Sequence, residues 1–154
     1  MRVPCFWRLA AVAGIASLLA SCGMSESREE SIAVADRYFA TIGSGDVTSA
    51  LGFYSEKFFS VTPHADFERT LTDLLQRCGK VKSHKLASWA TNSTVGMNAG
   101  STTILVYDVE YSACETNETM KIFKPDGGKA QIVAHAIKVK AGNAQHAGKP
   151  SQTI

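Results

Sequence analysis

The spacing of apolar residues predicts helices in the first half of this chain and strands in the second half. Over residues 31–42, apolar side chains recur every three or four positions, which is typical of one buried helix face. A shorter stripe of the same kind covers residues 47–54, after the break Gly43-Ser44-Gly45. A third helix is expected over residues 63–78, with proline at its first position and Gly79 ending it.

Two of these helices carry capping signals at their starts. Ser27 and Glu30 have the spacing of a capping box ahead of the first helix. Asp46 is placed to cap the second helix through its carboxylate.

After Gly79 the period of the pattern changes to two, which indicates strands. Residues 102–111 alternate, with apolar and aromatic side chains on one face and Asp108 and Glu110 on the other. Further strands are expected over three segments: residues 82–90, 116–123 and 130–139. The turn at residues 124–128 predicts an antiparallel hairpin, and residues 92–101 are expected to form an exposed loop.

The order of these elements predicts one α+β domain. Three N-terminal helices pack on one face of a curved antiparallel sheet of about four strands, because each element has one apolar face to bury.

The apolar run over residues 9–20 follows Arg2 and Arg8 and is too short to span a bilayer, so it reads as a secretory signal. The tetrapeptide Leu19-Ala20-Ser21-Cys22 resembles the lipobox of bacterial lipoproteins. That resemblance implies cleavage before Cys22, a diacylglycerol group on its thiol and an acylated new amino terminus, which together make a stable anchor. Gly23 favours the outer membrane, facing the periplasm. The alternative is an ordinary secreted signal in which the cysteine occurs by chance.

The expected organisation therefore has four parts. Residues 1–21 are the signal peptide, 22–30 a lipidated linker, 31–139 the folded domain and 140–154 a disordered tail. Without Arg2 and Arg8, the sixteen Lys and Arg become fourteen, equal to the fourteen Asp and Glu. A neutral mature chain has no basic footprint for nucleic acid.

Two of the four cysteines remain once the signal peptide and the lipidated position are set aside. Cys78 and Cys114 are expected to form a disulfide, since the cell envelope is oxidising. The alternative is two buried free thiols. Neither lies in a Cys-x-x-Cys pattern, and the histidines lie far apart in sequence, so no metal or cofactor is expected.

Several core and turn residues resemble the NTF2-like (cystatin-like) superfamily, in particular lipoproteins with a DUF4019-type domain. The resemblance rests on these positions: Tyr38-Phe39, Gly45-Asp46, Ala50-Leu51, Tyr54, Phe58-Phe59, Cys78-Gly79 and residues 106–111. It implies a cone-shaped fold whose sheet and helices enclose a pocket. Members include proton-transfer enzymes as well as modules that only bind, so the fold does not choose between them.

The enzyme alternative depends on few residues. His135 lies on the same predicted strand face as Val133 and Ile137, which makes it the one weak catalytic candidate, as a proton-transfer residue of an isomerase or dehydratase. Asp108 is expected to face solvent, and His64 and His84 read as surface residues.

The favoured interpretation is a non-catalytic module that binds an envelope protein or a small apolar ligand and is held at the membrane by lipid. Its candidate pocket residues are Trp89, Tyr107, Tyr111 and Met120. Pairing of two copies through the open sheet face is a further expectation that the resemblance implies.

Overall fold

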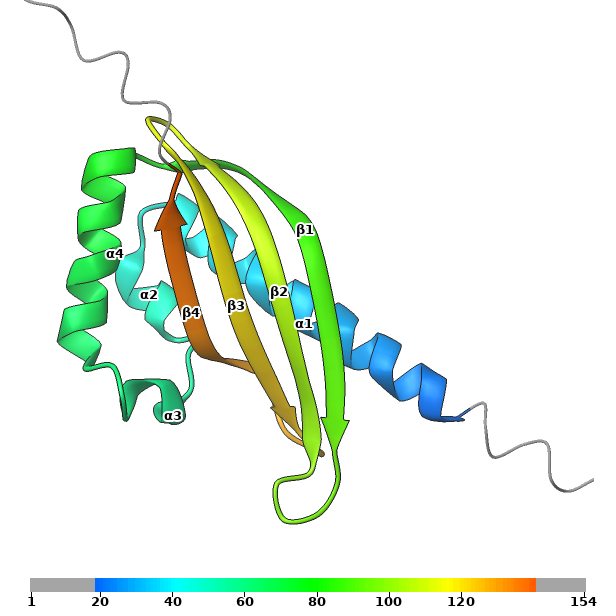
Figure 1. Ribbon diagram of the computed structural model, residues 1–154. Helices are drawn as coiled ribbons and strands as arrows, with labels where there is room; N and C mark the ends of the chain where they lie inside the picture. The colour runs from blue at the N-terminus through cyan, green and yellow to red at the C-terminus, as the bar shows by residue number, and fades with distance from the viewer. Residues whose placement is uncertain (1–18, 141–154) are drawn as a thin grey trace, which may run out of the picture.

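The computed structural model describes residues 19–140, with side chains from Ser25 onward. Its helices come first and its strands follow (Figure 1). The helices are α1 (Leu19–Gly43), α2 (Val47–Leu51), α3 (Glu56–Phe59) and α4 (His64–Cys78). The strands are β1 (Val81–Thr94), β2 (Gly100–Tyr111), β3 (Glu115–Pro125) and β4 (Gln131–Val139). The predicted α+β class is therefore confirmed.

The four strands form one antiparallel sheet in the order β1-β2-β3-β4. The predicted hairpin between the last two strands is present, with Met120 opposite His135. The first hairpin has a shorter loop than residues 92–101, because β1 runs on to Thr94 and β2 starts at Gly100. Hydroxyl pairs such as Thr91 with Thr103 continue the pairing there, where the apolar alternation no longer signals a strand.

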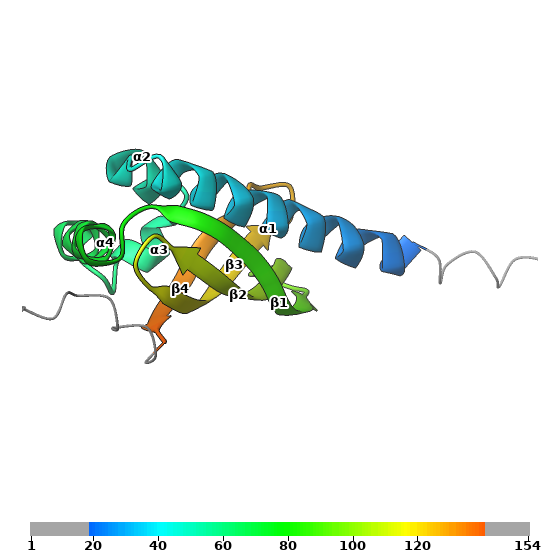
Figure 2. The same ribbon diagram turned by 90° about the horizontal axis from the view of Figure 1, so that it is seen from above.

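Helix α1 crosses the inner face of the curved sheet and contacts β1, β2 and β3 (Figure 2). Its buried stripe contains Tyr38, Phe39 and Ile42, as the spacing predicts. The capping box is wrong, because α1 already begins at Leu19 and Ser27 lies inside it. There the Ser27 carbonyl accepts a hydrogen bond from the Ser31 hydroxyl at 2.8 Å. Residues 22–30, expected as a linker, have helical backbone.

The remaining helices are short and begin at defined caps. Asp46 caps α2 as predicted, accepting a hydrogen bond from the Ser49 amide at 3.0 Å. Helix α3 was not expected, since four residues cannot show a helical repeat; the Ser55 hydroxyl caps it by accepting from the Phe58 amide. Segment 53–55 then pairs with Ile132 of β4, which ties this connection to the sheet.

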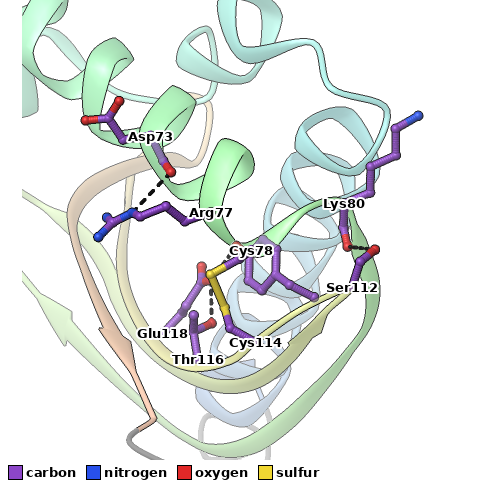
Figure 3. The surroundings of a disulfide bond; sticks show 9 residues. Asp73, Arg77, Cys78, Lys80, Ser112, Cys114, Thr116 and Glu118 are labelled. Atoms are coloured by element: carbon purple, nitrogen blue, oxygen red, sulfur yellow. Dashed lines mark hydrogen bonds between the residues drawn. A yellow bond between two sulfur atoms is a disulfide. The ribbon is translucent and has the colours of Figure 1, made fainter. Parts of the chain in front are cut away.

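A disulfide joins Cys78, at the end of α4, to Cys114, just before β3 (Figure 3). The pair expected from the sequence is thus formed, with the two Cα atoms 5.1 Å apart. Gly79 follows with a positive φ of 76°, and a Cβ at that position would lie 2.8 Å from the Ser112 Cβ. A residue without a side chain is therefore required where α4 turns into β1.

Residues 1–18 of the expected signal peptide (1–21) and residues 141–154 of the expected tail (140–154) lie outside the described residues, so the states expected of them stay predictions. Of the helices in the described part of the chain, none is long and apolar enough to cross a membrane.

Removing the disulfide tests how much it contributes to the fold. The double substitution Cys78→Ala/Cys114→Ala should lower the free energy of unfolding by about 2–4 kcal/mol, because opening the 36-residue loop restores entropy to the unfolded chain. Urea unfolding followed by circular dichroism measures the change. Reducing agent should destabilise the wild-type protein and leave the double variant unchanged. Equal stability of the oxidised wild-type protein and the variant would contradict the prediction.

Candidate functional site

The inner face of the sheet carries a polar cluster surrounded by apolar side chains. Antiparallel pairing places Trp89, Leu105, Met120 and His135 in one row across the four strands. Glu118 lies two residues before Met120 on the same face of β3, opposite Tyr107. A carboxylate therefore lies next to the imidazole in the middle of the core.

Glu118 accepts hydrogen bonds from three side chains. The hydroxyls of Tyr111 and Thr116 each lie 2.8 Å from its Oε1 atom. The Nε2 atom of His135 lies 3.1 Å from its Oε2 atom. Both oxygens are thus occupied by donors, which is the condition for keeping a carboxylate ionised away from water. Figure 3 shows the Thr116 bond beside the disulfide.

His135 links this carboxylate to the helical layer. Its Nδ1 atom lies 2.6 Å from the hydroxyl of Tyr54, which precedes α3. With Glu118 ionised, Nε2 carries the proton of the hydrogen bond to the carboxylate, and Nδ1 shares the second hydrogen bond of the ring with the Tyr54 hydroxyl. A continuous hydrogen-bonded chain therefore runs from Tyr54 through His135 and Glu118 to Tyr111.

The environment of each group shifts its pKa in a definite direction. Burial by itself raises the pKa of Glu118, but the hydrogen bond and charge of His135, with the Tyr111 and Thr116 hydroxyls, outweigh it and lower the pKa below 4.5. Burial raises the pKa of Tyr54 and of Tyr111 well above 10, and the Glu118 charge adds to the rise. At neutral pH the cluster therefore holds a carboxylate and protonated tyrosines.

Aromatic rings enclose His135. The Tyr38 ring packs edge-on against the imidazole at 5.5 Å between centroids, and the Tyr54 ring stacks on it at 6.0 Å. Phe67 of α4 contributes a third ring at 6.4 Å. These contacts hold the imidazole in one orientation and exclude solvent from it.

The cluster is closed. The side chains of Glu118 and His135 have no surface that a water molecule reaches, each being 0% exposed. A group that acts on a substrate must come within hydrogen-bond distance of it, and the enclosed side chains of Glu118 and His135 leave no exposed surface for that approach. The hydrogen bonds of this cluster thus hold the strands and the segment before α3 together, and its proton donors and acceptors are turned toward one another.

The four expected pocket residues all lie on the inner face, but they differ in burial. Tyr107, Tyr111 and Met120 are buried in the core, each at most 2% exposed. Trp89 is half exposed near the other end of β1, where the Arg28 guanidinium lies 4.6 Å from its ring centroid.

Glu118 is the important residue that the sequence reading missed. The alternation along this strand could have placed it on the buried face, since it shares that face with Thr116, Met120 and Ile122. His135 does point inward, as its strand suggested. A register shift in β4 makes Ile132, rather than Val133, its inward neighbour opposite Ile122, because one residue of β4 has no partner there.

The other candidates lie outside this cluster. His64 is exposed as expected, whereas His84 is only partly so: it stacks on Phe39 at 4.5 Å and lies 3.0 Å from an Asp36 carboxylate oxygen. Asp108 lies on the outer face, where Lys140 and Asn117 lower its pKa by hydrogen bonding.

Asp108 borders a shallow hollow of about 180 Å³ on the outer face. The hollow is lined by charged and polar side chains, among them Lys85, Glu110 and Glu115. No group of three potential metal ligands is found within residues 19–140.

Comparison of the chain with protein-family models, with curated proteins and with solved structures finds no match.

Replacing the buried carboxylate tests the pKa direction. Glu118→Gln should lower the free energy of unfolding by about 2 kcal/mol at pH 7, because charge-assisted hydrogen bonds are lost. A lowered pKa means that the carboxylate stabilises the fold above pH 4.5 and that this contribution disappears as pH falls through the folded-state value. The difference between wild type and variant should therefore shrink below pH 4.5, as read from urea unfolding at several pH values.

The matched control is Glu115→Gln in the same strand. Glu115 is exposed and pairs with Lys140 at 3.6 Å, so its loss should change stability by less than about 0.5 kcal/mol. A Glu118 effect that stays constant down to pH 3 would contradict the assignment of a buried carboxylate.

Two tyrosine substitutions separate hydrogen bonding from packing. Tyr54→Phe should cost about 1–3 kcal/mol, because His135 Nδ1 is left unpaired in the core. Tyr107→Phe removes a buried hydroxyl that has no hydrogen-bond partner among the described residues, so it should be close to neutral. Thermal or urea unfolding of both variants gives the comparison, and equal losses would contradict the proposed role of the Tyr54 hydroxyl.

Proposed function

We propose that this protein is a lipid-anchored lipoprotein of the bacterial cell envelope, attached to the outer membrane and facing the periplasm. Its folded domain is proposed to be a non-catalytic interaction module. The observation that carries the non-catalytic part is the closed polar cluster. His135 and Glu118 have no exposed side-chain surface, and the candidates Tyr107, Tyr111 and Met120 are buried in the core.

The anchor rests on the sequence. Leu19-Ala20-Ser21-Cys22 follows a short apolar run, and a polar segment follows it at once. Several acyl chains on Cys22 and its amino group would hold the protein durably, since one chain alone binds only reversibly.

We also propose membership of the NTF2-like superfamily, with a DUF4019-type domain. Support comes from the helices preceding a four-stranded antiparallel sheet and from α1 lying across its inner face. Five of the residues that carry the resemblance are buried in the shared core of helices and sheet: Tyr38, Phe39, Ala50, Leu51 and Tyr54.

The module is proposed to bind protein rather than a small apolar ligand. A ligand on the inner face would have to displace side chains such as Tyr107 and Met120, which already fill that space. Displacing well-packed core groups costs several kcal/mol, so the inner face is better suited to stabilising the domain than to receiving a guest. The proton-transfer alternative has the same obstacle, because its substrate would have to reach His135.

Mass spectrometry of the protein extracted from its own envelope tests both parts of this proposal. Tryptic cleavage after Arg28 should yield the peptide 22–28, which begins at Cys22 and carries the acyl groups. The native spectrum should show the acylated chain with a protein partner or a second copy and without a stoichiometric small molecule.

A Cys22→Ala variant is the control for the anchor and should incorporate no fatty acid. An unmodified peptide that includes Cys22 would refute the anchor. A small molecule released in equal amounts by denaturation would refute the interaction module and favour a carrier or an enzyme.

A further inference from the structure

The turn between β1 and β2 exposes apolar side chains on an ordered backbone. Val95 and Met97 are fully exposed, at 96% and 102%. The Thr94 hydroxyl donates to the Asn98 carbonyl at 3.0 Å, and the Ala99 amide donates to the Gly96 carbonyl at 3.0 Å. The backbone of this turn thus satisfies part of its own hydrogen bonding while it holds the two side chains outward.

The hairpin around this turn has no charged residue. Residues 86–107, which cover most of β1 and β2, contain no Asp, Glu, Lys, Arg or His. Charges at this end of the sheet belong to neighbouring segments, such as Asp126 and Lys129 between β3 and β4. The Asp126 amide donates to the Ala99 carbonyl, so that segment packs against the base of the turn. Figure 1 shows the β1–β2 turn reaching beyond it.

The start of α1 is fixed at the same end of the molecule. The Ser27 hydroxyl donates to the Ser101 hydroxyl at 3.1 Å, next to the turn. Arg28 lies over the Trp89 ring, and Glu30 pairs with Lys124 of β3. Cys22 precedes Ser27 in the same helix, only about 8 Å further along its axis at 1.5 Å per residue.

From these observations we infer that the β1–β2 turn contacts the lipid surface, with Val95 and Met97 entering the interfacial region beside the acylated Cys22. The inference rests on the proposed lipid anchor, which brings this end of the molecule to the membrane. This second contact orients the domain, so that the outer sheet face and α4 keep a fixed orientation relative to the bilayer.

A lipid surface suits this turn better than a protein partner does. Protein interfaces gain specificity from placed polar and charged groups, and the hairpin offers no charged group. A bilayer interface instead accepts exposed apolar side chains without requiring complementary shape, provided that few charges and unpaired backbone groups enter with them.

Site-specific labelling of the full-length acylated protein tests the contact. The variant Val95→Cys is labelled with an environment-sensitive fluorophore and reconstituted into vesicles of phosphatidylethanolamine and phosphatidylglycerol. The matched control is Val61→Cys, an exposed valine between α3 and α4, away from the start of α1. The Val95 label should shift to shorter wavelength and be quenched several-fold more by lipids brominated in the acyl chain than the Val61 label.

The parent protein separates this inference from the anchor. With Cys78 and Cys114 paired and Cys22 acylated, the mature parent should take up no label and should float with the vesicles. Label uptake at Cys22, or failure to float, overturns the anchor and with it the membrane contact.

Flotation with equal quenching at positions 95 and 61 overturns the membrane contact alone and leaves the anchor standing. A Val95 label that is shielded from solvent in native envelopes, but exposed to solvent in vesicles that contain no other protein, also overturns the membrane contact. The turn would then contact a protein instead of lipid.

Discussion

The fold depends on keeping one carboxylate ionised inside its core. Moving a carboxylate out of water costs several kcal/mol, and only well-placed donors offset that cost. Glu118 obtains them from Tyr111 on β2, Thr116 on β3 and His135 on β4. Tyr54 then extends the network to the connection between α2 and α3. The cluster therefore sets the positions of three strands and of the helical connection at once, because a shift in any of them leaves a buried polar group unpaired.

The same requirement limits what the inner face can do. In a catalytic site the groups that move protons border a space for substrate, whereas here aromatic rings fill the surroundings of the imidazole. The disulfide between Cys78 and Cys114 lies beside Thr116 and ties α4 to the start of β3 (Figure 3). The end of the sheet that holds the cluster is thus closed both by hydrogen bonds and by a covalent link. The outer face carries the polar hollow beside Asp108, and the opposite end carries the exposed side chains of Val95 and Met97.

The sequence predicts the elements better than it predicts the cluster. Helical and alternating periods identify α1, α4 and the strands β2, β3 and β4, each of which buries one face, whereas β1 has no fully buried residue. The start of α1 is not visible, because the part of the helix just before Ile32 buries Ser27 and Ser31, which carry no apolar signal. The burial of Glu118 is missed for a similar reason, because a charged residue is expected to be exposed until its hydrogen-bond partners are known. Those partners come from segments far apart in the chain, and the register shift in β4 that aligns His135 has no local signature.

The two ends of the sheet differ in the contacts that connect them to the helices. At the disulfide end, the connections between elements are covalently linked or packed against the core. At the other end, the contacts of α1 include the hydroxyl contact of Ser27 with Ser101, the Arg28 stack on Trp89 and the ion pair of Glu30 with Lys124. Single polar contacts of this kind contribute about 1 kcal/mol each or less. A pulling force applied at Cys22 would therefore be resisted mainly by the buried stripe of α1 at Tyr38 and Phe39. The helix that packs on the inner face thus also connects the core to any anchor at its start.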